Sequence, residues 1–188
     1  GPLRTSEGVE LGVRLNPGTK YELRVRNKNN KRLAVLAWID GRAVRPGPIV
    51  VRRGEQRTFR GIVLSRESVG GGNFVSAVQA LEARNPDEDE VDEDNEEEKT
   101  NGLIGVVLIR WYPVRFVNAR HDALNYTYKA PAVRGRARAE VLGSTLGKIS
   151  HSEGTHARRG RRAVVDQRKP PLGTFRFVLY NNETTTAR

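Results

Sequence analysis

The first half of the chain alternates between apolar and polar residues in short runs. In TKYELRVRN (19–27), Tyr21, Leu23 and Val25 fall on one face and charged residues on the other, a period of two that predicts a half-buried strand. RLAVLAWI (32–39) is apolar on both faces, as expected for a central strand covered on both sides. The turn-rich NKNN (27–30) between them predicts that the two strands form a hairpin, and Asp40-Gly41 predicts the next tight turn.

Similar short runs continue through the rest of the chain. We expect strands at PIVVR (48–52), RTFRGIVL (57–64), LIGVVLIRWYPVRFV (103–117) and GTFRFVLY (173–180), and at NFVSAVQALEA (73–83) a strand in preference to a short helix. Turns are expected at Arg53-Gly54 and in the glycine loop 68–73, and Pro113 should end or bulge its strand because proline donates no hydrogen bond. No segment sustains a 3.6-residue period. The pattern therefore predicts an all-β, antiparallel β-sandwich (jelly-roll-like). Its expected core includes Leu23, Val25, Leu36, Trp38, Phe59, Val107, Ile109 and Phe177.

An acidic segment interrupts this pattern at residues 85–102. It holds ten carboxylates between Asp87 and Glu98, bracketed by the turn signals Pro86 and Asn101-Gly102. Expected strands lie on both sides, so the segment is predicted to be a loop insertion too charged to fold alone. It would act either as an acidic strip that docks on basic residues, or as a tolerated loop without a role of its own.

The rest of the chain carries an excess of positive charge. The net charge is +11 and would rise by ten, to +21, without the acidic block 87–98. Residues 120–172 form a basic, Gly/Arg-rich extension that we expect to be irregular. The chain is then one domain, 1–188, with its core at about 9–119 and 173–180. A net positive charge of this size favours anionic partners.

Two arginine clusters within the basic extension are the candidate contact residues. They comprise Arg134, Arg136 and Arg138, and Arg158, Arg159, Arg161 and Arg162. Guanidinium groups pair with phosphate through two parallel donors, and glycines between them let the backbone follow an irregular path. Aromatic residues that stack on bases are scarce here, which argues against base-specific recognition. A nucleic acid, an acidic protein surface and no specific partner all remain open.

The sequence offers little catalytic chemistry. There are no cysteines and three histidines, His121, His151 and His156, and the last two sit in a Gly/Ser-rich stretch with no expected strand to orient them. Gly70-Gly71-Gly72 lacks the lysine of a phosphate-binding loop. We therefore expect no enzyme, no catalytic residues, no metal site and no cofactor.

Several motifs resemble a β-sandwich module that recurs in uncharacterised phage, bacterial and large-DNA-virus proteins. They are Val25 and Asn27, Ile39-Asp40-Gly41, Arg53-Gly54-Glu55, Phe59 to Gly61, and the later GLIGVVLIRWY, together covering roughly residues 9–115. The acidic insertion and the basic extension depart from that module. These motifs specify turns and strands more than chemistry, so the resemblance implies a structural or interaction role, in a virion for example.

Together these features predict a non-enzymatic structural or interaction protein of a viral or virion-associated kind. Its basic arm would contact protein subunits, of its own or another kind, or packaged nucleic acid. The alternative is a sequence-nonspecific nucleic-acid-binding protein. No apolar run is long enough for a membrane span and no secretion signal is seen, so we expect no membrane partner. A viral protein of this kind would reside in the virion or in the host cytoplasm or nucleus.

Overall fold

The computed structural model describes residues 2–5, 8–85, 103–118, 128–131, 141–144, 147–155 and 161–182. The strands of these residues are β1 (Pro2–Thr5), β2 (Gly8–Leu15), β3 (Lys20–Tyr21), β4 (Leu23–Arg26), β5 (Leu33–Ile39), β6 (Arg42–Ala43), β7 (Ile49–Val51), β8 (Gln56–Phe59), β9 (Gly61–Gly70), β10 (Asn73–Glu82), β11 (Val106–Pro113), β12 (Arg115–Asn118), β13 (Ile149–Thr155), β14 (Arg161–Val164) and β15 (Gly173–Asn181).

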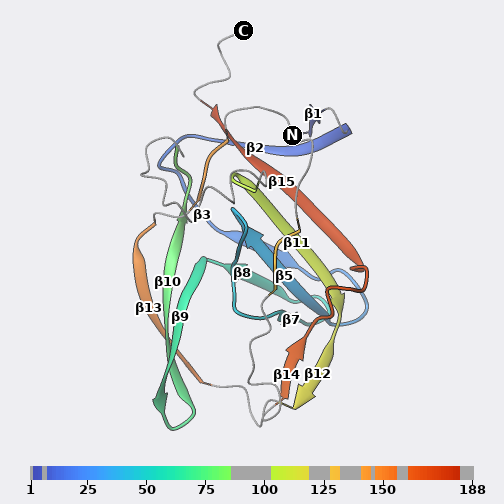
Figure 1. The fold of residues 1–188 in the computed structure, drawn as a ribbon, viewed down its shortest axis with the longest axis vertical. Helices are drawn as coiled ribbons and strands as arrows, with labels where there is room; N and C mark the ends of the chain where they lie inside the picture. Colours follow the sequence, from blue (N-terminus) through green and yellow to red (C-terminus); the bar gives the residue numbers. More distant parts are fainter. Residues whose placement is uncertain are drawn as a thin grey trace.

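The described strands assemble into sheets that pack on one another. The largest sheet has the order β1-β2-β15-β11-β5-β6, with β7 also paired to β5 (Figure 1). A second sheet holds β13, β10 and β3, with β9 on the other side of β10, and shorter pairs are formed by β4 with β8 and by β12 with β14. The predicted all-β sandwich is confirmed. One pairing departs from the antiparallel expectation, because β2 and β15 run parallel.

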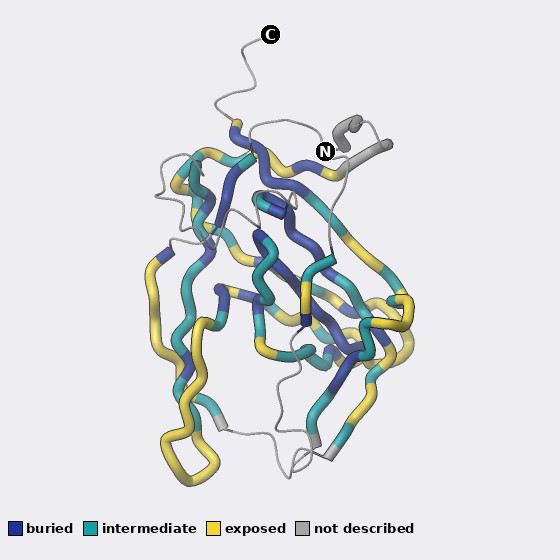
Figure 2. The backbone as a smooth tube through the Cα atoms, viewed as in Figure 1, coloured by how far each residue is buried: buried dark blue, intermediate teal, exposed yellow. Residues whose placement is uncertain are grey.

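Strand β5 is an interior strand of the large sheet, between β11 on one side and β6 and β7 on the other, and is buried along its whole length (Figure 2). Its odd-numbered side chains, Leu33 to Ile39, join a core cluster with Phe59, Val107 and Ile109, which faces β4, β8 and β10. Its even-numbered side chains, with Trp38 the largest, join a second cluster on the opposite face. The strand is apolar on both faces because each face packs against a different core.

The predicted core residues are all at least partly buried, but they divide between these two clusters. Leu23, Phe59, Val107 and Ile109 belong to the first, with Val25 and Phe177 packed against it at partial burial. Leu36 and Trp38 belong to the second. The expectation of one shared core therefore needs correction: residues two apart on β5 share a face, and Leu36 and Trp38 point away from Leu23.

The turns follow the predicted chemistry closely. Asp40 and Gly41 both have positive φ and close the β5–β6 hairpin, the geometry of a primed two-residue turn. The loop predicted at 68–73 is shorter in the structure, because β9 runs to Gly70 and β10 begins at Asn73; the hairpin turns through Gly70, Gly71 and Gly72 at positive φ. Residues 73–83 form a strand, β10, over most of their length, and β11 ends at Pro113 as predicted.

The hairpin predicted for residues 19–39 is wrong. The first run splits at Glu22 into β3 and β4; β3 pairs with β10, and β4 pairs with β8. Strand β5 instead pairs with β11, β6 and β7. A strand buried on both faces belongs in a sheet that is covered on both sides, whereas β4 has a solvent face and serves as a covering strand. The turn between them therefore crosses from one layer to the next.

The basic extension also differs from the expectation of an irregular arm. Of its described residues, 149–155 form β13 along the edge of β10, and 161–164 form β14 against β12. Tyr128, Leu142 and Val165 are buried, and Tyr128 and Val165 cover the Trp38 face of β5. The extension thus supplies part of the core. The acidic block 87–98 lies outside the described residues.

Candidate polyanion-binding surface

Of the arginines predicted to make contacts, one has a side chain that the structure describes. Arg134, Arg136, Arg138, Arg158 and Arg159 lie outside the described residues, and Arg161 begins β14 with only its backbone described. Arg162 follows on β14, half-buried, with a guanidinium nitrogen 3.7 Å from the position that a Cβ on Gly47 would occupy. It therefore lies against the loop between β6 and β7.

Arg162 belongs to a set of four arginines whose charges act on one another, Arg57, Arg45, Arg66 and Arg162. They come from β8, the β6–β7 loop, β9 and β14 respectively. The pKa of Arg45 is lowered, first by burial and then by the charges of Arg57 and Arg66. The pKa of Arg66 is lowered by burial and by the charge of Arg162. Each guanidinium is therefore close enough to its neighbour to feel its charge. We call this set the arginine row.

Backbone and ring contacts hold the two middle arginines in place. Val44, directly before Arg45, is fully buried; its N–H donates to Ala37 (2.9 Å) and its carbonyl accepts from Val63 (3.0 Å). The Arg45 guanidinium then lies 5.9 Å from the centre of the Phe59 ring. Arg66 stacks more closely, 4.3 Å from the centre of the Phe74 ring. The Nε of Arg45 is buried and has no hydrogen-bond partner among the described residues.

A second basic surface lies at the β4 end of the molecule, where two turns interlock around Asn27. The Asn27 N–H donates to Glu55 (3.0 Å), and its carbonyl accepts from Gly54 (2.9 Å). Its buried side chain donates to the carbonyls of Lys31 (2.8 Å) and Val51 (3.0 Å). One polar side chain thus fixes the turn after β4 against the turn after β7.

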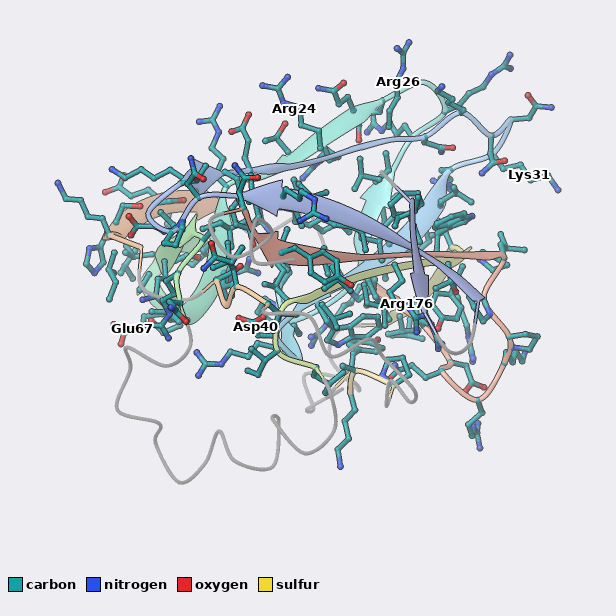
Figure 3. The ribbon with its side chains drawn as sticks, turned by 90° about the horizontal axis from the view of Figure 1, so that it is seen from above. Arg24, Arg26, Lys31, Asp40, Glu67 and Arg176 are labelled. Carbon is teal, nitrogen blue, oxygen red and sulfur yellow. The ribbon has the colours of Figure 1, made fainter. Side chains whose placement is uncertain are left out.

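The interlocked turns carry a concentration of exposed cations. Figure 3 shows Arg24 and Arg26 projecting from β4 and Lys31 from the turn that follows. Arg24 is paired with Glu22 at 2.7 Å, and Arg32 lies 5.2 Å from the centre of the Phe116 ring. We call this surface the basic end; its cations are Arg24, Arg26, Lys28, Lys31, Arg32, Arg52 and Arg53. The arginine row begins beside it, since Arg57 pairs with Val25 of β4 across the two strands.

The described residues offer little of the geometry that catalysis needs. His151 is exposed on β13, which corrects the expectation of an unstructured setting, while His121 and His156 lie outside the described residues. Nowhere in the described ranges do three His, Cys, Asp or Glu side chains gather as metal ligands. The pocket lined by Trp38, Arg45 and Tyr128 has an interior of about 10 Å³, room for about one water molecule.

The buried carboxylate of Asp40 links segments of the fold through hydrogen bonds. It accepts backbone hydrogen bonds from Gly105 (2.7 Å) and Ser144 (2.8 Å). These bonds tie the β5–β6 turn to the segment before β11 and to residues 141–144 of the basic extension. Asp40 is 4% exposed, so its charge serves the fold and is out of reach of a ligand.

Comparison with protein-family models, with curated proteins and with solved structures gives no match. None of the described residues belongs to a long apolar helix of the kind that crosses a bilayer.

Of the arginine row, the sequence pattern indicated Arg162 and did not indicate the other three. Arg45, Arg57 and Arg66 are single arginines within or beside strands, and no local pattern separates them from ordinary solvated charges. The basic end carried a visible signal, in the runs RVRNKNNKR (24–32) and RRGEQR (52–57). By themselves those runs predict only turns, because their proximity depends on the pairing of β4 with β8.

Proposed function

We propose that this protein is a non-enzymatic structural or interaction protein whose basic end binds the phosphate backbone of nucleic acid without reading its sequence. The observation that carries the proposal is the basic end itself, where exposed arginines and lysines gather on turns fixed by Asn27. Cations on a fixed frame lose less freedom on binding than cations on a flexible arm. Phosphate contacts of this kind position a duplex and carry no base information.

The motifs that resemble the β-sandwich module support an interaction role in the same way. Asn27, Asp40-Gly41 and Gly54 act here as turn residues. A fold whose distinctive residues maintain turns leaves its surface free to specify a partner. A place in a virion is consistent with this role and remains part of the proposal.

Titration with random-sequence duplex DNA, from about 50 to 200 mM salt, tests the proposal. Arg26→Gln with Lys31→Gln should weaken binding and lower the log–log salt slope by up to about 0.9 for each phosphate that is no longer neutralised. Lys20→Gln with Lys148→Gln is the matched control, since it removes the same charge from exposed positions outside the basic end.

Equal losses of affinity in the two double variants would show that net charge alone matters and that the basic end is not the surface. No binding by the wild-type protein at the lowest salt would overturn the nucleic-acid proposal. It would direct the search to acidic protein surfaces.

A further inference from the structure

Phe116 is an exposed aromatic side chain that lies beside the basic end. It is 38% exposed on β12, and the guanidinium of Arg32 lies over its ring, 5.2 Å from the ring centre. Scattered exposed apolar side chains are ordinary on protein surfaces. Phe116 differs from them because the cation over its ring belongs to the surface that we propose binds phosphates.

The pairing of the large sheet explains why this ring and the basic end lie together. Leu33, the first residue of β5, pairs with Pro113 of β11 on one side and with Val51 of β7 on the other. The turn that carries Arg32 therefore meets the sheet between the start of β12 and the turn 52–55. Neighbouring strands are about 4.8 Å apart, so these three segments leave the sheet from adjacent positions at one end. Backbone pairing thus holds the ring beside the cations.

Strand β12 gives the ring a fixed position and leaves part of it uncovered. Phe116 pairs with Ala163 of β14, whose small side chain covers little of an aromatic ring. The two strands are anchored at their base, because Val114 packs against the second core and Val164 and Val165 are buried. A ring on an anchored strand loses little freedom when a ligand stacks on it.

We propose that the basic end takes single-stranded nucleic acid, and that a base of the strand stacks on the platform formed by Phe116 and Arg32. Unpaired bases stack on aromatic rings and on guanidinium planes, and every base has a face that can do so. The cations of the basic end neutralise the nearby phosphates. In a duplex the base faces are covered by neighbouring base pairs, so the platform gains no contact. This inference rests on the proposed function and names its substrate class.

Two oligonucleotides of about 12 nucleotides test the platform, one made of thymidines and one of the same length without bases. Random-sequence duplex DNA is the third ligand. The wild-type protein should bind the thymidine strand about tenfold more tightly than the strand without bases, as expected for one stacked base. This ratio should hold from about 50 to 200 mM salt while both affinities fall, because stacking releases no counterions.

Phe116→Leu keeps an apolar side chain and removes the ring. Its affinity for the thymidine strand should fall to that for the strand without bases, and its affinity for the duplex should be unchanged. Phe116→Tyr keeps the ring and should keep the ratio. Phe175→Leu is the matched control and should also keep it, since Phe175 is 44% exposed but lies on β15 opposite Ile109, inside the sheet and not at its end. Thermal melting checks that each variant is folded.

Equal affinity of the wild-type protein for the two strands would overturn the platform and would leave the phosphate contacts of the proposed function standing. That comparison needs no variant. The inference also fails if Phe116→Leu keeps the ratio, if Phe175→Leu loses it equally, or if Phe116→Leu weakens the thymidine strand and the duplex by the same factor. No binding to any of the three ligands at the lowest salt would overturn the proposed function, and the inference with it.

Discussion

Asn27 illustrates how single side chains fix this fold where the backbone cannot. Its amide donates to two carbonyls and its oxygen accepts from the Asn29 N–H at 2.8 Å, so the side chain replaces three backbone partners in a turn. Gly61 has a different role: a Cβ at this position would collide with the Gln79 carbonyl. This close approach lets the first residue of β9 pack tightly against β10. The roles of Asn27 and Gly61 cannot be read from the local sequence, because they depend on contacts with residues far along the chain.

Trp38 is a residue whose replacement tests the second core. It is 1% exposed, and its Nε1–H donates to the Tyr128 carbonyl at 3.0 Å. Trp38→Ala should cost about 3–5 kcal/mol of unfolding free energy, measured by denaturant titration. Trp111→Ala, on the partly buried edge of the first core, is the comparison and should cost less. A loss below about 1 kcal/mol for Trp38→Ala would contradict the burial of this face.

Tyr21 should limit stability at high pH. Burial raises the pKa of its phenol above the usual 10.0; the Ser144 hydroxyl partly offsets this rise, and the charge of Asp40 adds to it. Above pH 10 the unfolded chain releases this proton while the folded protein retains it. The free energy of unfolding should therefore fall by about 1.4 kcal/mol per pH unit from this residue alone.

Denaturant titrations of wild type and Tyr21→Phe from about pH 8 to 11.5 measure this effect. The difference between the two proteins should be constant below about pH 9 and should then shift in favour of Tyr21→Phe. Parallel profiles over the whole range would show that Tyr21 ionises in the folded protein as it does in the unfolded chain.

At the scale of elements, strand character was predictable and strand partners were not. The alternation of β5 between two apolar faces is visible in RLAVLAWI and is realised as two cores. GVELGVRL (8–15) has the same period-two signal and forms β2, which sequence reasoning did not single out. Partners were missed because pairing is decided by which faces must be covered. The turn 27–32 could have closed a hairpin as readily as it crosses between layers.

The acidic insertion between β10 and β11 should be dispensable for folding. Its flanks are anchored outside the block, by the backbone bonds between Arg84 and Gly143 and by the buried Leu103. Deletion of Asp87 to Glu98 should leave a cooperative melt within a few degrees of wild type. It removes no apolar residue except Val91, and closing a shorter loop costs less conformational entropy. A broad or absent transition would show that the acids are structural.

For the whole molecule, the chain returns on itself to complete both layers. Strand β15, near the C-terminus, pairs in parallel with β2 near the N-terminus and antiparallel with β11 (Figure 1). The basic extension closes the second core through Tyr128 and Val165. The same extension brings Arg162 to the arginine row. The segment that completes the second core therefore also carries Arg162 to the row.

The acidic block should also compete with external anions for the basic surfaces. Its deletion raises the net charge from +11 to +21, so DNA binding should tighten, most at low ionic strength where screening is weakest. A variant with every acid of the block changed to its amide keeps the loop length and should tighten binding equally. If only the deletion tightens binding, loop length and not charge is responsible.

The sequence by itself determined the all-β class, the position of most strands, the turns at Asp40-Gly41 and Gly70 to Gly72, and the excess of positive charge. These follow from local signals, because period-two alternation and positive-φ residues act within a few positions of the chain. The tertiary structure alone decided that β4 pairs with β8, that the basic extension carries core residues, and that Arg45, Arg57, Arg66 and Arg162 come near enough to act on one another's charge. Each of these features depends on contacts between segments that are distant in the sequence. Such contacts form because buried faces must be covered on both sides. The local pattern of charges therefore does not predict which arginines come close together.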